Sequence, residues 1–142
     1  LDIILGASYV DTEVSELPTA IAPSGQSEAP LAPKWSLNGL ARYAFATSDG
    51  GEFSVQGDFR WVDDHYFSLA QIPILFQGSY AVVNARLGYT SMDEKWSAAL
   101  SINNLTDERY NHFAYDALAF FGMYSNLIGD QRWVGASISY RW

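Results

Sequence analysis

Polar and apolar residues alternate with a period of two along most of this chain, and this pattern constrains its fold more than any other feature. Successive side chains of a β-strand point to opposite faces, so each alternating segment is predicted to be a strand with one apolar and one polar face. Helical periodicity is nearly absent. The six predicted strands cover, approximately, residues 1–14, 34–47, 52–63, 80–91, 95–109 and 131–142.

The connections between these strands alternate in length. Residues 15–33, 64–79 and 110–130 form long connections, whereas Ser48-Asp49-Gly50-Gly51 and Ser91-Met92-Asp93-Glu94 are short turn signals. An antiparallel meander places all the long loops at one end and all the short turns at the other. Outer-membrane β-barrels have this arrangement, with long extracellular loops and short periplasmic turns.

Charges within the predicted strands segregate to one face. The apolar row includes Leu37, Val55, Leu87, Leu100 and Ile138, and charged residues within the second to sixth strands lie on the opposite face. A basic side chain facing lipid at mid-membrane costs roughly 2–4 kcal/mol, so contact with a bilayer would enforce this segregation. The residues predicted to face the lumen are Arg42, Asp58, Arg60 and Arg86, with Arg141 on the same face of the last strand.

Aromatic residues collect near the strand ends, where membrane barrels carry interfacial girdles. The turn-side girdle is predicted to contain Tyr43, Phe45, Phe53, Tyr89, Trp96, Tyr140 and Trp142. The loop-side girdle is predicted to contain Tyr9, Trp35, Phe59, Trp61, Tyr80 and Tyr110. A soluble β-sandwich binding module also alternates, but it would bury the apolar row against a second sheet.

Composition excludes several other classes of protein. No apolar run approaches the ~18 residues of a membrane-spanning helix. The net charge of −8 argues against nucleic acid as a partner, and the absence of Cys excludes disulfides and thiol chemistry. Asp63-Asp64-His65 is interpreted as a solvated loop segment, so we expect no metal site. No catalytic spacing is recognisable, and we expect neither enzymatic activity nor a cofactor.

Three segments resemble the C-terminal end of TonB-dependent outer-membrane receptors. Ser101–Tyr110 contains an Asn-Leu-Thr-Asp run followed by Tyr and is similar to the penultimate strand of that family. Gly129–Trp142 is similar to the final strand, and Leu31–Asn38 resembles the Ala-Pro-Lys start of an earlier strand. Two positions depart from the family pattern: Gln131 stands where Pro is common, and Trp142 stands where Phe is usual.

The resemblance implies that residues 1–142 form the C-terminal, all-β part of a 22-stranded antiparallel transmembrane barrel in the bacterial outer membrane. It also implies an N-terminal plug domain and an energy-coupling box for the TonB complex, both absent from this sequence. Six strands do not close a barrel, because single-chain barrels have at least about eight. We therefore expect the rest of the barrel and the plug to be partners, together with outer-membrane lipid and the barrel-assembly machinery.

The implied function is import of a scarce nutrient, such as an iron–siderophore complex, by TonB-coupled active transport. A passive porin and a small structural barrel are the alternatives within the membrane class. Aromatic loop residues are predicted to contact a small-molecule ligand of unknown identity, namely Tyr66, Phe67, Phe76, Tyr115, Phe120, Phe121 and Tyr124. The predicted assembly signal in the last strand consists of Ile138, Tyr140 and Trp142.

Overall fold

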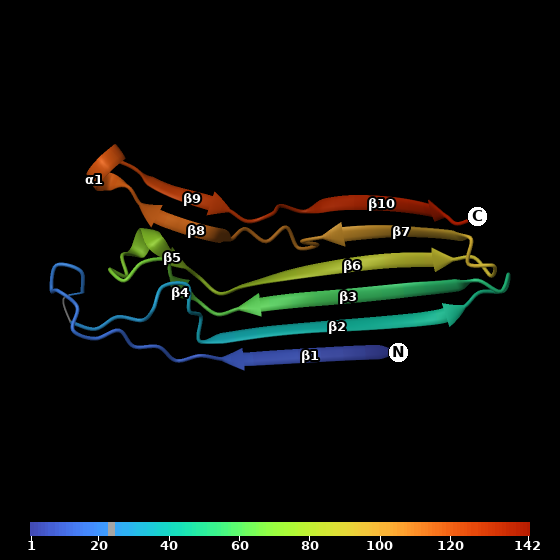
Figure 1. Ribbon diagram of the computed structural model, residues 1–142, viewed down its shortest axis with the longest axis horizontal. Coiled ribbons are helices and arrows are strands. Elements are labelled where there is room, and N and C mark those ends of the chain that lie inside the picture. Colours follow the sequence, from blue (N-terminus) through green and yellow to red (C-terminus); the bar gives the residue numbers. More distant parts are fainter. Residues whose placement is uncertain (23–24) are drawn as a thin grey trace.

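Six antiparallel strands form a single sheet in the order β1-β2-β3-β6-β7-β10 (Figure 1). The computed structural model describes residues 1–22 and 25–142, apart from the side chains at 119 and 120. The strands of the sheet are β1 (Asp2–Tyr9), β2 (Trp35–Ala46), β3 (Glu52–Val62), β6 (Tyr80–Thr90), β7 (Trp96–Asn103) and β10 (Trp133–Tyr140). Figure 1 shows the long connections at one end and the short turns at the other, which confirms the predicted meander.

Two predicted strands end earlier than expected on the loop side. The prediction that the first strand continues to residue 14 is wrong, because β1 ends at Tyr9 and Val14 forms an isolated antiparallel bridge with Ser27. The prediction that the fifth strand continues to residue 109 is also wrong. β7 ends at Asn103, because Asn104 adopts a positive φ of 50°, which interrupts extended backbone.

Two of the predicted loops contain regular structure. The connection after β3 holds β4 (His65–Tyr66), the 3-10 turn η1 (Pro73–Leu75) and β5 (Phe76–Gln77). The connection after β7 holds β8 (Asn111–Asp116), α1 (Leu118–Phe121) and β9 (Tyr124–Ile128). Each element is too short for its periodicity to be recognised in the sequence. Among the described residues, no helix combines the length and the hydrophobicity needed to cross a membrane.

The strand register places the alternating residues on two distinct faces. One cross-strand row runs from Tyr43 through Val55, Leu87 and Leu100 to Ala136, and we call its side of the sheet the apolar face. The neighbouring row, on the other side, consists of Arg42, Gln56, Arg86, Ser101 and Gly135, and we call this side the polar face.

The sequence of β1 alternates less clearly, but its pairing with β2 shows which of its residues belong to each face. Ile3 pairs with Ala41 and Leu5 pairs with Gly39, so the odd-numbered residues of β1 belong to the apolar face. Asp2 pairs with Arg42 on the polar face.

The apolar face has no covering layer within the described part of the chain. Leu5 and Ile138 are 75% and 77% exposed, and both belong to this face. A β-sandwich would bury such residues between two sheets, so the single layer argues against that fold. Gly39 provides local close packing, because a Cβ at this position would lie 2.5 Å from the Phe59 ring and 2.9 Å from Leu5.

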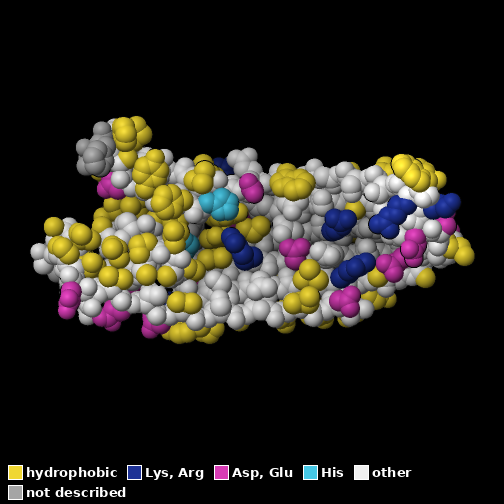
Figure 2. All heavy atoms as spheres, viewed as in Figure 1, with side chains coloured by type: hydrophobic (Ala, Val, Ile, Leu, Met, Phe, Trp, Pro, Cys, Tyr) yellow, Lys and Arg dark blue, Asp and Glu magenta, His cyan; other side chains and the backbone are white. Residues whose placement is uncertain are grey.

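The polar face carries both charged and hydrophobic side chains (Figure 2). Figure 2 shows basic and acidic side chains gathered over the strands, whereas hydrophobic side chains concentrate over the loop end of the molecule. The segregation of charge predicted from alternation is therefore present in the folded sheet.

Aromatic contacts occur at both ends of the apolar face. Ring centroids lie 4.8 Å apart for Tyr9 and Trp35 at the loop end, and 4.6 Å apart for Trp96 and Tyr140 at the turn end. The assignment of Tyr80 and Tyr110 to the loop-side girdle is wrong. Tyr80 lies an even number of residues from Arg86 on β6, so it belongs to the polar face. Tyr110 lies beyond the end of β7, and both tyrosines are buried beneath the loops.

The turn between β2 and β3 is tied by backbone and side-chain hydrogen bonds. The Thr47 amide donates to the Gly51 carbonyl over 2.8 Å, and Gly50 has a positive φ of 84°. Hydrogen bonds donated by the Thr47 and Tyr89 hydroxyls lower the pKa of the Asp49 carboxyl to about 2.

A pair of lysine substitutions in the middle of β2 tests the two faces. In the full-length protein, Ala41→Lys places a charge on the apolar face and should lower the free energy of unfolding by roughly 2–4 kcal/mol. Leu40→Lys is the matched control, because it places the same charge one residue away on the polar face, where Asp58 is the cross-strand neighbour. Urea unfolding in lipid vesicles measures both variants. Equal losses of stability would contradict the assignment of the faces.

Candidate ligand-binding surface

A small hydrophobic cluster holds the long connections together at one end of the sheet. Phe67, Leu75 and Ala114 are buried against one another, and Ile72 and Tyr124 pack around them. We call the described parts of residues 10–34, 63–79 and 104–132 the loop layer. Because Phe67 and Leu75 belong to one connection and Ala114 to another, the cluster joins the β4–β5 and β8–β9 hairpins.

Two buried amide side chains reinforce the loop layer. Gln77 of β5 accepts a hydrogen bond from the Asn111 amide of β8 over 2.8 Å. The Asn104 side chain donates to the carbonyls of Glu108 and Asp130, each over 2.9 Å, and accepts from the Glu108 amide over 2.8 Å. The Asn104 side chain therefore joins the first residues of the connection between β7 and β10 to its last residues. Sequence reasoning identified this Asn only as part of a family-like run and did not predict its contacts.

A stacked tyrosine pair lies where the loop layer meets the polar face. The rings of Tyr80 and Tyr110 are nearly parallel, with centroids 4.4 Å apart. Gly129 allows this arrangement, because a Cβ at that position would fall against the Tyr110 ring. Burial raises the pKa of the Tyr110 hydroxyl, and the neighbouring Tyr80 adds to the shift. Arg60 donates to the Tyr80 hydroxyl over 3.1 Å.

The predicted ligand-contacting aromatics have different environments in the loop layer. Tyr66 and Phe76 contact each other, with ring centroids 5.0 Å apart, and Phe76 is exposed. Tyr115 and Phe121 are exposed as well. Phe67 is only 6% exposed and Tyr124 packs against its cluster, so these two side chains stabilise the loops. The side chain of Phe120 lies outside the described residues.

The four residues predicted to face the lumen share the polar face and have separate partners. Arg42 forms an ion pair with Glu52 at 3.4 Å. Asp58 accepts a hydrogen bond from the Asn84 side-chain amide over 2.7 Å. The Arg60 contact with Tyr80 connects this face to the loop layer, and Arg86 lies across from Gln56 and Ser101.

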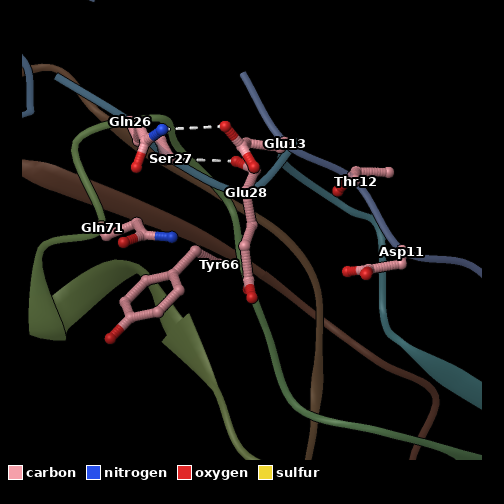
Figure 3. Close-up of a pocket in the computed structure, with 8 residues that line it drawn as sticks. All are labelled: Asp11, Thr12, Glu13, Gln26, Ser27, Glu28, Tyr66 and Gln71. Carbon is pink, nitrogen blue, oxygen red and sulfur yellow. Dashed lines mark hydrogen bonds between the residues drawn. The ribbon is translucent and has the colours of Figure 1, made fainter. Parts of the chain in front are cut away.

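The larger of two polar cavities in the loop layer is acidic (Figure 3). It has a volume of about 550 Å³, and its walls carry Asp11, Glu13 and Glu28. The Gln26 side-chain amide donates to Glu13 over 2.9 Å, and Lys34 forms an ion pair with Glu28 at 2.7 Å. The hydrogen bond with Glu28 raises the pKa of the Lys34 ammonium group.

The second cavity lies at the junction with the strands and has the opposite character. Its volume is about 320 Å³, and its walls include Arg60, His65 and His112. His65 is buried, with Nδ1 3.2 Å from the Asp63 carbonyl oxygen. Within the described residues, no group of three or more His, Cys, Asp or Glu side chains has an arrangement that could hold a metal ion.

These features define a class of protein. An antiparallel single-layer meander with an uncovered apolar face, a charged opposite face and long loops gathered at one end is the architecture of a membrane β-barrel wall. A family model described as "TonB dependent receptor-like, beta-barrel" matches residues 1–105. The chain therefore belongs to the TonB-dependent receptor β-barrel family, whose barrels lie in the bacterial outer membrane.

A solved structure has the same fold. The chain is similar to the ferric yersiniabactin uptake receptor FyuA from Yersinia pestis, with a TM-score of 0.70 and 21% sequence identity. The match covers 80% of this chain and 17% of that receptor, so this chain spans less than a fifth of the length of the relative.

Truncation of the buried leucine tests whether the hydrophobic cluster orders the loop layer. Leu75 is 1% exposed, so Leu75→Ala should cost about 2–5 kcal/mol of local stability and make the loops more sensitive to protease. The neighbouring Ile74 is 53% exposed, and Ile74→Ala is the matched control with little expected effect. Limited proteolysis of the full-length receptor in detergent measures both. Equal cleavage rates for the two variants would refute the role of the cluster.

Proposed function

We propose that residues 1–142 are the C-terminal barrel part of an outer-membrane receptor that imports a scarce nutrient by TonB-coupled active transport. The family match over residues 1–105 carries this proposal. The gathering of the long loops into one packed layer supports it, because ligands of such receptors arrive at the extracellular loops. In this proposal the plug domain and the energy-coupling box belong to the full-length protein, N-terminal to this part.

The exposed aromatics of the loop layer are the proposed ligand contacts. Tyr115, Phe121 and Phe76 are exposed, and Tyr66 lies against Phe76. Aromatic side chains provide a large contact area with little loss of conformational entropy on binding. We assign the polar face to the barrel lumen, where Arg42, Asp58 and Arg86 would contact the plug or water.

The proposed cargo is a metal chelate such as an iron–siderophore complex. FyuA is a ferric yersiniabactin uptake receptor, and its barrel has the same fold as this chain. From this likeness we propose the class of cargo, a metal chelate, and not a particular chelator.

Uptake measurements in a strain that lacks the full-length gene test this function. Complementation should restore accumulation of at least one labelled ferric siderophore, and deletion of TonB should abolish it. Tyr115→Ala should raise the Kd for that siderophore about two- to tenfold, the usual contribution of an aromatic contact. Leu127→Ala is the matched control, because Leu127 is also exposed and lies on β9 of the same hairpin. Accumulation that persists without TonB would indicate a passive porin instead.

The last strand is also proposed to carry the signal read by the barrel-assembly machinery. Ile138 and Tyr140 lie on the apolar face, and the Trp142 ring centroid is 6.5 Å from that of Tyr140. Trp142→Ala should lower the amount of receptor in the outer membrane several-fold, whereas Trp142→Phe should preserve it. Trp133→Ala, at an exposed tryptophan on the polar face of the same strand, is the control. The measurement is the amount of receptor in isolated outer membranes. A normal amount of the Trp142→Ala variant would exclude Trp142 from the assembly signal.

A further inference from the structure

The smaller cavity of the loop layer is bounded by groups that favour a negatively charged ligand. Arg60, His65 and His112 line it, together with Asn111, and no Asp or Glu is among its lining residues. Figure 2 shows histidine side chains next to a basic side chain on the polar face, where the strands meet the loop layer. A neutral histidine ring has one N–H donor, and the contact of His65 Nδ1 with the Asp63 carbonyl uses it, so His112 and the Asn111 side-chain amide are the donors beside Arg60.

Arg60 has donors available for a ligand. A guanidinium group carries five N–H donors, and one nitrogen of Arg60 donates to the Tyr80 hydroxyl. Within residues 1–22 and 25–142, no carboxylate lies within ion-pair distance of Arg60, whereas Arg42 pairs with Glu52 and Lys34 with Glu28. Arg60 is held in position by a neutral partner and has no ion-pair partner within the described part of the chain.

The charge of this cavity contrasts with that of the chain. The sequence has sixteen acidic residues and eight Lys or Arg, and the larger cavity has three carboxylates on its walls. The walls of the smaller cavity carry one arginine, two histidines and no acid. A cavity with this lining attracts an oxyanion, whereas the larger cavity repels one.

The remaining wall of the cavity is mostly apolar, since it consists of Leu31, Pro33, Ser36, Val62 and Tyr80. Val62 is buried beside Tyr80, whose ring is fixed by stacking on Tyr110. The Arg60 guanidinium carbon lies 5.9 Å from the centroid of the Tyr80 ring. Tyr110 and Arg60 cover the two faces of the Tyr80 ring, so a ligand could place a charged group on Arg60 and an apolar body against the more exposed Leu31 and Pro33. The volume of about 320 Å³ is at the lower end of the range for small-molecule sites.

We infer that the cavity around Arg60, Asn111 and His112 is a binding site for a small carboxylate with an apolar body. This inference rests on the proposed receptor function and specifies part of its ligand chemistry. The carboxylate accepts paired hydrogen bonds from the Arg60 guanidinium, and the apolar body contacts Leu31 and Pro33. Such a group belongs either to the imported nutrient complex or to a free metabolite at the receptor mouth.

Titration calorimetry with a minimal probe tests the site in the full-length receptor in detergent. Benzoate is the probe, and benzamide is its neutral counterpart of the same shape. Benzoate should bind, and Arg60→Gln should weaken its binding about ten- to hundredfold, the usual effect of losing a charge-assisted hydrogen-bonding partner. Arg86→Gln, which removes a charge from the same face outside this cavity, should leave the benzoate Kd unchanged.

Two further variants separate the geometry of the site from its charge. Arg60→Lys retains the charge without the planar fork and should bind benzoate with an intermediate Kd. Tyr80→Phe removes the hydroxyl that positions Arg60 and should weaken benzoate while leaving benzamide unaffected. Heat-modifiable electrophoretic migration establishes that each variant is a folded barrel before its affinity is compared.

Three results would overturn the inference: no benzoate binding to the folded receptor, equal binding of benzoate and benzamide, or unchanged affinity in Arg60→Gln. Absence of binding would mean that another part of the full-length chain neutralises Arg60. Competition between benzoate and the labelled siderophore in the uptake assay distinguishes the two sources of the carboxylate. A receptor that binds benzoate through Arg60 but imports no siderophore would contradict the proposed cargo and leave this site intact.

Discussion

The structure depends on backbone hydrogen bonds between neighbouring strands of a single sheet. Each face of the sheet is left to meet its own surroundings, apolar on one side and polar on the other. In hydrocarbon, unpaired backbone N–H and C=O groups are too costly to tolerate, so a barrel wall satisfies them between strands. The side chains then have only two directions. The continuous register from β1 to β10 aligns Tyr43, Val55, Leu87 and Leu100 on one side and Arg42 and Arg86 on the other. The chain belongs to a family of outer-membrane barrels, in which lipid contacts the outer face, and this accounts for the exposed apolar face.

The loop layer is stabilised by a different principle. Within the described residues, the sheet has one layer and buries side chains only at its loop end, whereas the loops enclose a hydrophobic cluster around Leu75 that resembles the interior of a soluble protein. Buried amide side chains complete it, with Gln77 joining two hairpins and Asn104 joining the start and end of the last long connection. This order gives the exposed loop residues a surface of defined shape, which is the property that the proposed ligand binding needs.

Electrostatics divide the loop layer into two regions. The larger cavity is acidic, and the smaller one is basic and lies directly above the strands. Arg60 belongs to both the polar face and the smaller cavity, because its strand ends at Val62 beneath the loops. This junction between the loop layer and the polar face is where we propose that a carboxylate binds.

The sequence alone determined the six strands of the main sheet, their meander order and the two faces, because alternation and connection length are local signals with a direct geometric meaning. It did not determine the ends of the first and fifth strands or the burial of Tyr80 and Tyr110, since a positive φ at Asn104 and coverage by distant loops depend on tertiary contacts. The loop site was predictable only as a set of aromatic residues. Folding separated Phe67, which is buried as structural support, from Tyr115 and Phe121, which are exposed. Only the tertiary structure brought His112 to the cavity of Arg60 and His65, because it lies on β8, in a different connection, and no local pattern encodes that proximity.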